Sequence, residues 1–256
     1  MFADVLRSEY NRFANEVERG NGQGYANTYL SSQAVFNALQ TIYRTVGPMY
    51  ARRAFNSRER QKSISIGSFD FWVDAILQYL GDNFYNRGLL RITETTRKHF
   101  LDILNQGFRE GWSPLRTAEY IREDPAIDSV IRFRAEMISR TETGRAIHSG
   151  TFVGADKSPF VKVKEWISAK DSRTRRNPEN KPQGADHWRL DGQVVEFSEQ
   201  FTDPSTGTKL EHPHDPKARA IEVVNCRCTY AVLNKVDKNG NLIRKPNNST
   251  TIFPVS

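Results

Sequence analysis

The amino-acid sequence predicts an α+β fold, in which a mainly helical N-terminal part is followed by a small mixed α/β C-terminal domain. Apolar residues recur at helical spacing through the first 150 residues, whereas from about residue 159 they alternate with polar residues between turn-forming runs. A length of 256 residues suits one large domain or two small ones. We expect a helical region over 1–110, a compact domain over 111–235, and a C-terminal hairpin with a loose tail over 236–256.

Four segments of the N-terminal part predict helices, namely 2–19, 30–46, 69–85 and 89–108. In the third segment, the i, i+3, i+4, i+7 pattern of a buried stripe is formed by Phe69, Trp72, Val73 and Ile76. Glycine and proline predict the breaks between segments, at 20–24, 47–48 and 81–88.

Two further helix starts combine a capping side chain with a proline at the first helical position. They are Ser113-Pro114 and Asp124-Pro125. We expect the second of these helices to run to about His148 and to end at the glycine-containing run 150–154.

The period of the sequence changes after residue 159. Val161, Val163 and Ile167 alternate with Lys162, Lys164 and Trp166, which predicts a strand. The β-branched segment 221–232 predicts a second strand, and turn-prone runs lie between the two.

Composition excludes several classes of protein. Apolar runs stay well short of the roughly 18 residues that span a bilayer, and the N-terminus lacks the pattern of a signal peptide, so we expect no membrane association. The two cysteines are too few for a disulfide framework, which suits synthesis in a reducing cytoplasm. The formal net charge of +7 favours an anionic partner, in particular nucleic acid.

A basic run over 157–176 is the candidate surface for such a partner. We expect non-specific contacts to the phosphates of double-stranded DNA from Lys157, Lys162, Lys164, Lys170, Arg175 and Arg176. The alternative is a solvated charged face without a partner.

A set of charged residues in the last third of the chain predicts a polar framework, formed by Arg140, Glu142, Asp171, Arg173 and Asp191. Glu142 shares a helix face with Ile138, so its carboxylate needs a cationic partner, either Arg145 nearby or an arginine of the 171–175 run. Our hypothesis is a Glu142–Arg173 pair, and its alternative is a solvated helix face with local ion pairs. The two aspartates are expected to fix turns.

The cysteines and histidines offer a candidate metal site. Cys226 and Cys228 would lie on one side of a strand and, with histidines from the loops, would suit tetrahedral zinc. The candidate ligands are Cys226, Cys228, His187 and His212, with His214 nearby in sequence. The alternative is a pair of buried cysteines without metal. A small metal-dependent nuclease using Asp171 and the histidines is a further alternative, although the spacing matches no nuclease motif.

The order of these motifs resembles the phage head morphogenesis domain of bacteriophage Mu-like minor head proteins, also called minor capsid proteins. The resemblance covers roughly residues 110–232. It is carried by Ser139-Arg140-Thr141-Glu142-Thr143, Asp171-Ser172-Arg173-Thr174-Arg175, His187 before Leu190-Asp191-Gly192, and Asn225-Cys226-Arg227-Cys228. Many relatives carry a cysteine pair shortly after the Asp-x-Arg-Thr element, where this chain has Arg175-Arg176-Asn177-Pro178.

The resemblance implies a structural protein of the virion and not an enzyme. Such proteins lie in the capsid interior or at the portal vertex after assembly in the host cytoplasm, and act in head assembly, DNA packaging or genome delivery. The implied partners are the portal protein and the major capsid or scaffold protein. Some relatives carry a fused toxin or nucleotide-transfer domain, for which the residues after the last motif leave no room.

Overall fold

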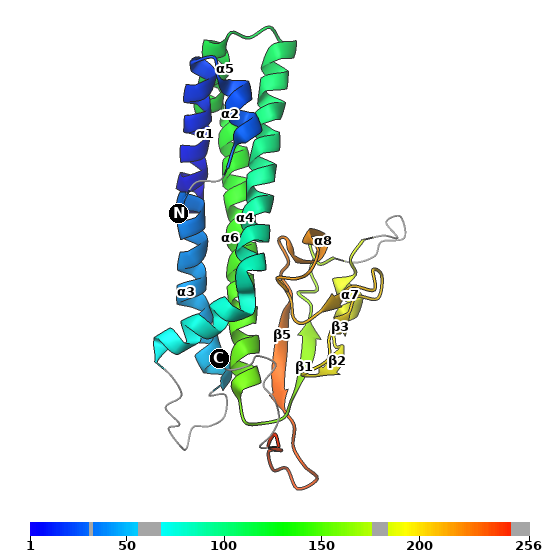
Figure 1. Ribbon diagram of the computed structural model, residues 1–256. Coiled ribbons are helices and arrows are strands. Elements are labelled where there is room, and N and C mark those ends of the chain that lie inside the picture. Colours follow the sequence, from blue (N-terminus) through cyan, green and yellow to red (C-terminus); the bar gives the residue numbers. More distant parts are fainter. Residues whose placement is uncertain (31–32, 56–67, 176–183, 247–256) are drawn as a thin grey trace. The chain divides into compact units, whose positions relative to one another are not determined.

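The computed structural model describes residues 1–30, 33–55, 68–175 and 184–246, without the side chains of 81–88. The fold is α+β, as predicted: the N-terminal part is mainly helical, and antiparallel strands lie in the C-terminal region (Figure 1). Among the described residues, none of the helices combines the length and the apolar character needed to cross a lipid bilayer.

The helices of the N-terminal part are α1 (Phe2–Glu18), α2 (Gly22–Thr28), α3 (Gln33–Phe55), α4 (Phe69–Arg109), α5 (Pro114–Glu123) and α6 (Pro125–Lys157). Both expected caps are present. The Ser113 hydroxyl accepts the backbone N–H of Arg116 at 3.1 Å, and the Asp124 carboxylate accepts that of Ala126 at 2.8 Å.

Three of the expected helix ends are wrong. α3 continues through 47–48, α4 runs unbroken through 81–88, and α6 continues through 150–154 to Lys157. A glycine inside a helix costs about 1 kcal/mol and the proline inside α3, Pro48, about 3 kcal/mol, and burial of the surrounding apolar residues outweighs these costs. In α6 the glycines mark a close contact instead: a Cβ atom on Gly150 would lie 2.2 Å from the carbonyl oxygen of Gly47, and one on Gly154 2.0 Å from that of Ala51.

The chain forms two compact units, each discontinuous in sequence. The first consists of Met1–Thr41 and Asp82–Ser139, and the second of Ile42–Gly81 and Arg140–Ser256. The expected division into 1–110, 111–235 and 236–256 stays a prediction. In the first unit, the rings of Phe13 and Phe100 stack at 4.1 Å between centroids, and the buried Arg134 donates to the hydroxyl groups of Tyr10 and Thr96 at 3.1 and 2.8 Å.

The second unit contains the strands. β1 (Lys162–Ile167) lies between β2 (Val194–Glu196) and β5 (Thr229–Asn234) in an antiparallel sheet, with Trp166 opposite Tyr230. β3 (Phe201–Thr202) and β4 (Lys209–Leu210) form a two-stranded ribbon, and α7 (His187–Leu190) and α8 (Ala220–Val223) are single turns. The core beside the sheet is formed by Trp166, Leu190, Phe201, Leu210, Ala218, Val223, Cys226 and Cys228.

The second expected strand is wrong over 221–228, because Ile221 belongs to α8 and β5 begins only at Thr229. β1 also buries the face that carries Lys162, Lys164 and Trp166. Near the C-terminus, an antiparallel bridge joins Val236 to Leu242, at the position of the expected hairpin. The expected loose tail from residue 247 lies outside the described residues.

Candidate functional site

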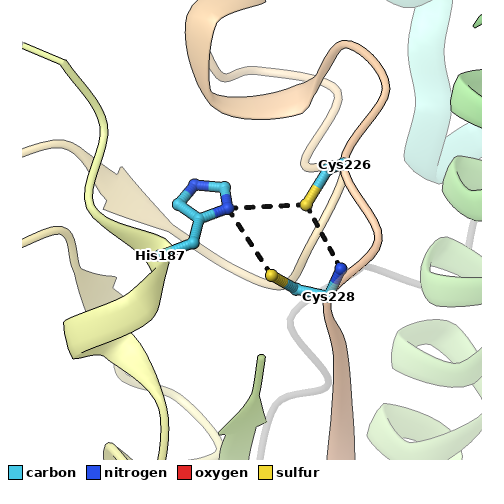
Figure 2. Close-up of side chains that lie close together, drawn as sticks. All are labelled: His187, Cys226 and Cys228. Atoms are coloured by element: carbon cyan, nitrogen blue, oxygen red, sulfur yellow. Dashed lines mark hydrogen bonds between the residues drawn. The ribbon is translucent and has the colours of Figure 1, made fainter. Parts of the chain in front are cut away.

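Three buried side chains of the second unit converge on one point (Figure 2). His187 begins α7, and Cys226 and Cys228 lie in the irregular segment between α8 and β5. The Nδ1 atom of His187 lies 3.4 Å from Sγ of Cys226 and 3.7 Å from Sγ of Cys228. Both cysteines are free thiols. The expectation of a metal at these three residues stays a prediction, and the expected placement of the two cysteines on a strand is wrong, because β5 begins only at Thr229.

The imidazole of His187 is held from its opposite side. Its Nε2 atom lies 3.1 Å from a carboxylate oxygen of Glu222, and the other carboxylate oxygen accepts the Thr206 hydroxyl at 2.9 Å. The backbone carbonyl of His187 accepts the hydroxyl of Ser168. The ring edge also contacts Trp166, with centroids 5.2 Å apart. These contacts fix the ring with Nδ1 directed at the sulfur atoms.

Hydrogen bonds and burial shift the pKa values of all three groups. The hydrogen bond from Cys226 and the contact with His187 lower the pKa of the Cys228 thiol, despite burial. The same hydrogen bond and burial raise the pKa of the Cys226 thiol. Burial alone would lower the pKa of His187, but the hydrogen bonds to Cys228 and Glu222 outweigh it and raise that pKa. The two thiols are therefore shifted in opposite directions, with the lower pKa on Cys228 and the higher on Cys226.

A second group of candidate ligands consists of His187, Asp203 and Glu222. The oxygens of Asp203 are already occupied by backbone donors: one accepts the N–H of Asp186 at 2.7 Å, and the other those of Ser205 and Thr206 at 2.8 Å. Asp203 therefore shapes the loop after β3, and the sulfur-containing group is the better metal site.

The other motif residues of the second unit bind one another. Arg140 donates to the side chain of Asn225, whose backbone N–H donates to the Thr141 hydroxyl at 2.9 Å. Asp171 accepts the side chain of Arg227. Asp191 accepts the backbone N–H of Ser168 at 2.7 Å and fixes the end of β1. These contacts join α6, the turn after β1 and the segment before β5.

The expected Glu142–Arg173 pair is wrong. The carboxylate of Glu142 binds the Nη1 atom of Arg145 through both oxygens at 2.7 Å and accepts the hydroxyl of Tyr43. All three side chains are buried, so the alternative of a solvated helix face is wrong as well. Arg145 lies one helical turn from Glu142 and reaches it first. Arg173 is exposed, and its backbone N–H donates to Asp171 at 2.9 Å.

A family model described as Phage Mu protein F like protein matches residues 98–231, just over half of the chain. The chain belongs to this family. The resemblance drawn from the ordered motifs is thereby confirmed, and the protein is related to the phage head. No curated protein and no solved structure is similar enough to this Mu F-like chain to be matched.

The Mu F-like chain places His212 away from the cysteines, so its expected role as a fourth ligand is wrong. His212 stacks on Tyr230, with ring centroids 5.9 Å apart, and its Nε2 atom lies 3.0 Å from the hydroxyl of Tyr79. The neighbouring His148 and His214 are stacked, with their Nδ1 atoms 3.2 Å apart. Burial lowers the pKa of His148 and that of His212 to about 3, so both rings are neutral at physiological pH.

The nuclease alternative drew on four residues that this Mu F-like structure places in different surroundings. Asp171 binds Arg227, His187 faces the cysteines, and His212 and His214 lie among the buried aromatic rings. The expectation that the protein is not an enzyme stays a prediction.

The expected basic surface is smaller than the sequence indicates. Lys162 and Lys164 are buried, so their assignment to DNA binding is wrong. The ammonium group of Lys162 binds Asn234, and that of Lys164 lies 3.3 Å from a carboxylate oxygen of Glu211. It also lies 5.2 to 5.5 Å from the ring centroids of Phe152, Phe197 and Phe201. A long lysine stem can therefore occupy an inward position of a strand when the charged end has such partners.

The remaining four cations stay predicted contacts to DNA. Lys157 lies over the ring of Phe71, and Lys170 lies over that of Trp188 and 3.3 Å from Asp191. Arg175 donates to the backbone carbonyl of Val224. The fourth, Arg176, lies outside the described residues.

Sequence reasoning missed two residues of the Mu F-like structure, Glu222 and Tyr43. Glu222 sits in a short β-branched run that resembles a strand, and nothing nearby indicates its contact with His187. Tyr43 was one aromatic among many in a predicted helix. In both cases the partner lies far along the chain, so local pattern carries no signal.

Proposed function

We propose that this protein is a minor capsid protein of a tailed phage, located in the capsid interior or at the portal vertex, with a role in head assembly, DNA packaging or genome delivery. The observation that carries the proposal is the family match over residues 98–231. The charged motifs within that match bind one another and join α6 to the strands, as described for Arg140 and Asp171. Such an arrangement supports a structural role for the motifs, in which they hold the fold together.

The proposed partners are the portal protein and, in addition, the major capsid or scaffold protein. Candidate contacts in the first unit are the large apolar side chains that α4, α5 and α6 expose, Phe108, Leu115 and Phe133. Exposed apolar residues occur singly on most proteins, so these positions are test sites for the partner surface.

The experiment is to locate the protein during infection. Mass spectrometry of purified proheads and mature virions should find it in both at a few copies per particle. Cross-linking should join it to the portal protein. A phage lacking the gene should yield heads that are defective in assembly, DNA content or infection. Absence of the protein from both kinds of particle would refute the proposal.

A variant pair makes the partner test sharper. Phe133→Ala should reduce co-purification with the portal protein, whereas Val194→Ala, at an exposed position of β2 in the second unit, should not. Equal effects of the two substitutions would remove Phe133 from the proposed contact surface.

The proposal is for a structural protein and not an enzyme. The purified chain should leave supercoiled plasmid DNA intact in the presence of Mg²⁺, Mn²⁺ or Zn²⁺. Metal-dependent cleavage that His187→Ala abolishes would instead favour the nuclease alternative.

A further inference from the structure

We propose that His187, Cys226 and Cys228 bind a Zn²⁺ ion that holds the C-terminal part of the second unit together. These are the buried side chains that meet in Figure 2. The site would be present whether or not the protein enters a phage head.

The two sulfur–nitrogen distances fit zinc. Zinc lies about 2.3 Å from thiolate sulfur and about 2.0 to 2.1 Å from imidazole nitrogen, so a tetrahedral ion requires a sulfur–nitrogen separation of about 3.6 Å. The two separations in the protein are 3.4 and 3.7 Å. All ligand atoms lie within 4.8 Å of one another. Tetrahedral zinc would also require a sulfur–sulfur separation of about 3.8 Å, which lies inside this limit.

The burial of the three side chains favours a structural ion over a reactive thiol. His187, Cys226 and Cys228 are 1%, 2% and 4% exposed, so a substrate has little access to either sulfur atom. Two buried thiolates repel each other and are costly to remove from water. A divalent cation cancels both charges, which makes this ligand set stable inside a protein.

The surroundings of the ligands match those of metal sites. A histidine that binds metal through one ring nitrogen commonly donates its other N–H to a carboxylate. Here Glu222 accepts from Nε2 of His187 and is itself held by the Thr206 hydroxyl. The backbone N–H of Cys228 donates to Sγ of Cys226 at 3.4 Å and so supplies one hydrogen bond to that sulfur. Glu222 is thus a positioning residue and leaves Nδ1 for the ion.

The position of the site explains what an ion would do. Its ligands come from α7 and from the segment before β5, and the chain between them contains only short elements, namely β2, β3, β4 and α8. A region with so little regular structure gains stability from a metal cross-link. Among the described residues these three side chains are the ligands assigned to the ion.

The test uses the full chain purified after growth with added zinc. Elemental mass spectrometry should find one zinc per chain. Exchange for Co²⁺ should produce the visible bands of tetrahedral cobalt and the near-ultraviolet sulfur-to-cobalt charge-transfer band. Cys226→Ser, Cys228→Ser and His187→Ala should each lose the metal, whereas His99→Gln, which removes a histidine of the first unit, should retain it.

Two measurements keep the test decisive if a ligand variant fails to fold. Modification of the wild-type cysteines with a mercurial should release zinc in proportion to the thiols modified. Glu222→Gln, with both cysteines and His187 intact, should weaken zinc affinity by about 10- to 100-fold in chelator competition. A folded wild-type chain that binds neither zinc nor cobalt, or one that binds them equally well after both cysteines are blocked, would overturn the proposal.

Discussion

The close contact between α3 and α6 allows the effect of one substitution on the free energy of unfolding to be worked out from distances. Gly154 faces the backbone of α3 so closely that an added Cβ atom would lie 2.0 Å from the carbonyl oxygen of Ala51. Ordinary carbon–oxygen contacts begin near 3.4 Å. A backbone carbonyl within a helix cannot rotate away, so Gly154→Ala must move the helices apart by roughly 1 to 1.5 Å.

Two opposing effects determine how much Gly154→Ala changes the free energy of unfolding. Alanine stabilises a helix interior by about 0.5 to 1 kcal/mol relative to glycine. Overpacking typically costs about 1 to 3 kcal/mol, and a clash with backbone belongs at the upper end of that range. We therefore expect Gly154→Ala to lower the free energy of unfolding by about 2 kcal/mol. Gly150→Ala should behave similarly, and the double variant should cost less than the sum because one displacement accommodates both methyl groups.

The assay is denaturant unfolding followed by circular dichroism and tryptophan fluorescence. Gly24→Ala is the matched control: Gly24 lies at an exposed position of α2, and the atom nearest to an added Cβ is the end of the Asn21 side chain, which can move aside. We expect that control to be neutral or slightly stabilising. If Gly154→Ala were as stable as Gly24→Ala, the close contact between α3 and α6 would be refuted.

Three further predictions concern buried and exposed charges. Arg145→Leu leaves the Glu142 carboxylate buried without a cation and should lower the free energy of unfolding by about 3 to 5 kcal/mol, measured by thermal or denaturant unfolding. The control, Arg116→Leu at an exposed ion pair, should lower it by less than about 1 kcal/mol. Equal losses would contradict the buried pair. Burial lowers the pKa of His148 and of His212 to about 3, so between about pH 6.5 and 3 the unfolded chain binds protons that the folded chain does not. The free energy of unfolding should therefore fall as the pH drops through this range, by about 1.4 kcal/mol per pH unit for each histidine. A denaturation midpoint unchanged between pH 7 and 5 would argue against neutral buried rings. If the three described cations among the remaining basic residues contact DNA phosphates, affinity should fall roughly 40-fold between about 50 and 200 mM salt, and binding insensitive to salt would exclude such contacts.

Features that depend on neighbouring residues were predictable from the sequence. The α+β class followed from the change of period, and the cap at Ser113 followed from the proline after it. One longer-range approach, that of His187 to the cysteines, was among the ligand combinations that the residue types offered, but the sequence did not distinguish His187 from His212. The family followed from motif order.

Features that depend on distant residues were not predictable. A glycine can end a helix or admit a neighbouring backbone, and only the opposite helix decides which applies at Gly150. The burial of Lys164 depends on Glu211 and on aromatic rings from other elements, none of which is visible in the alternation of β1. The local partner of Glu142 was available in the sequence as Arg145, and the longer-range choice of Arg173 was the error.

The helix contact at Gly47 and Gly150 also bears on how the protein is made. The ends of α3 and α6 are separated by roughly 100 residues of chain. A ribosome working at about 5 to 20 residues per second therefore completes α6 about 5 to 20 seconds after α3. During that interval Tyr43 and Ala51 of α3 lack the contacts that they make with Glu142 and Gly154 of α6. Aggregation of this protein is therefore a hazard of the nascent chain, and slower growth with a chaperone that covers α3 should raise the soluble yield.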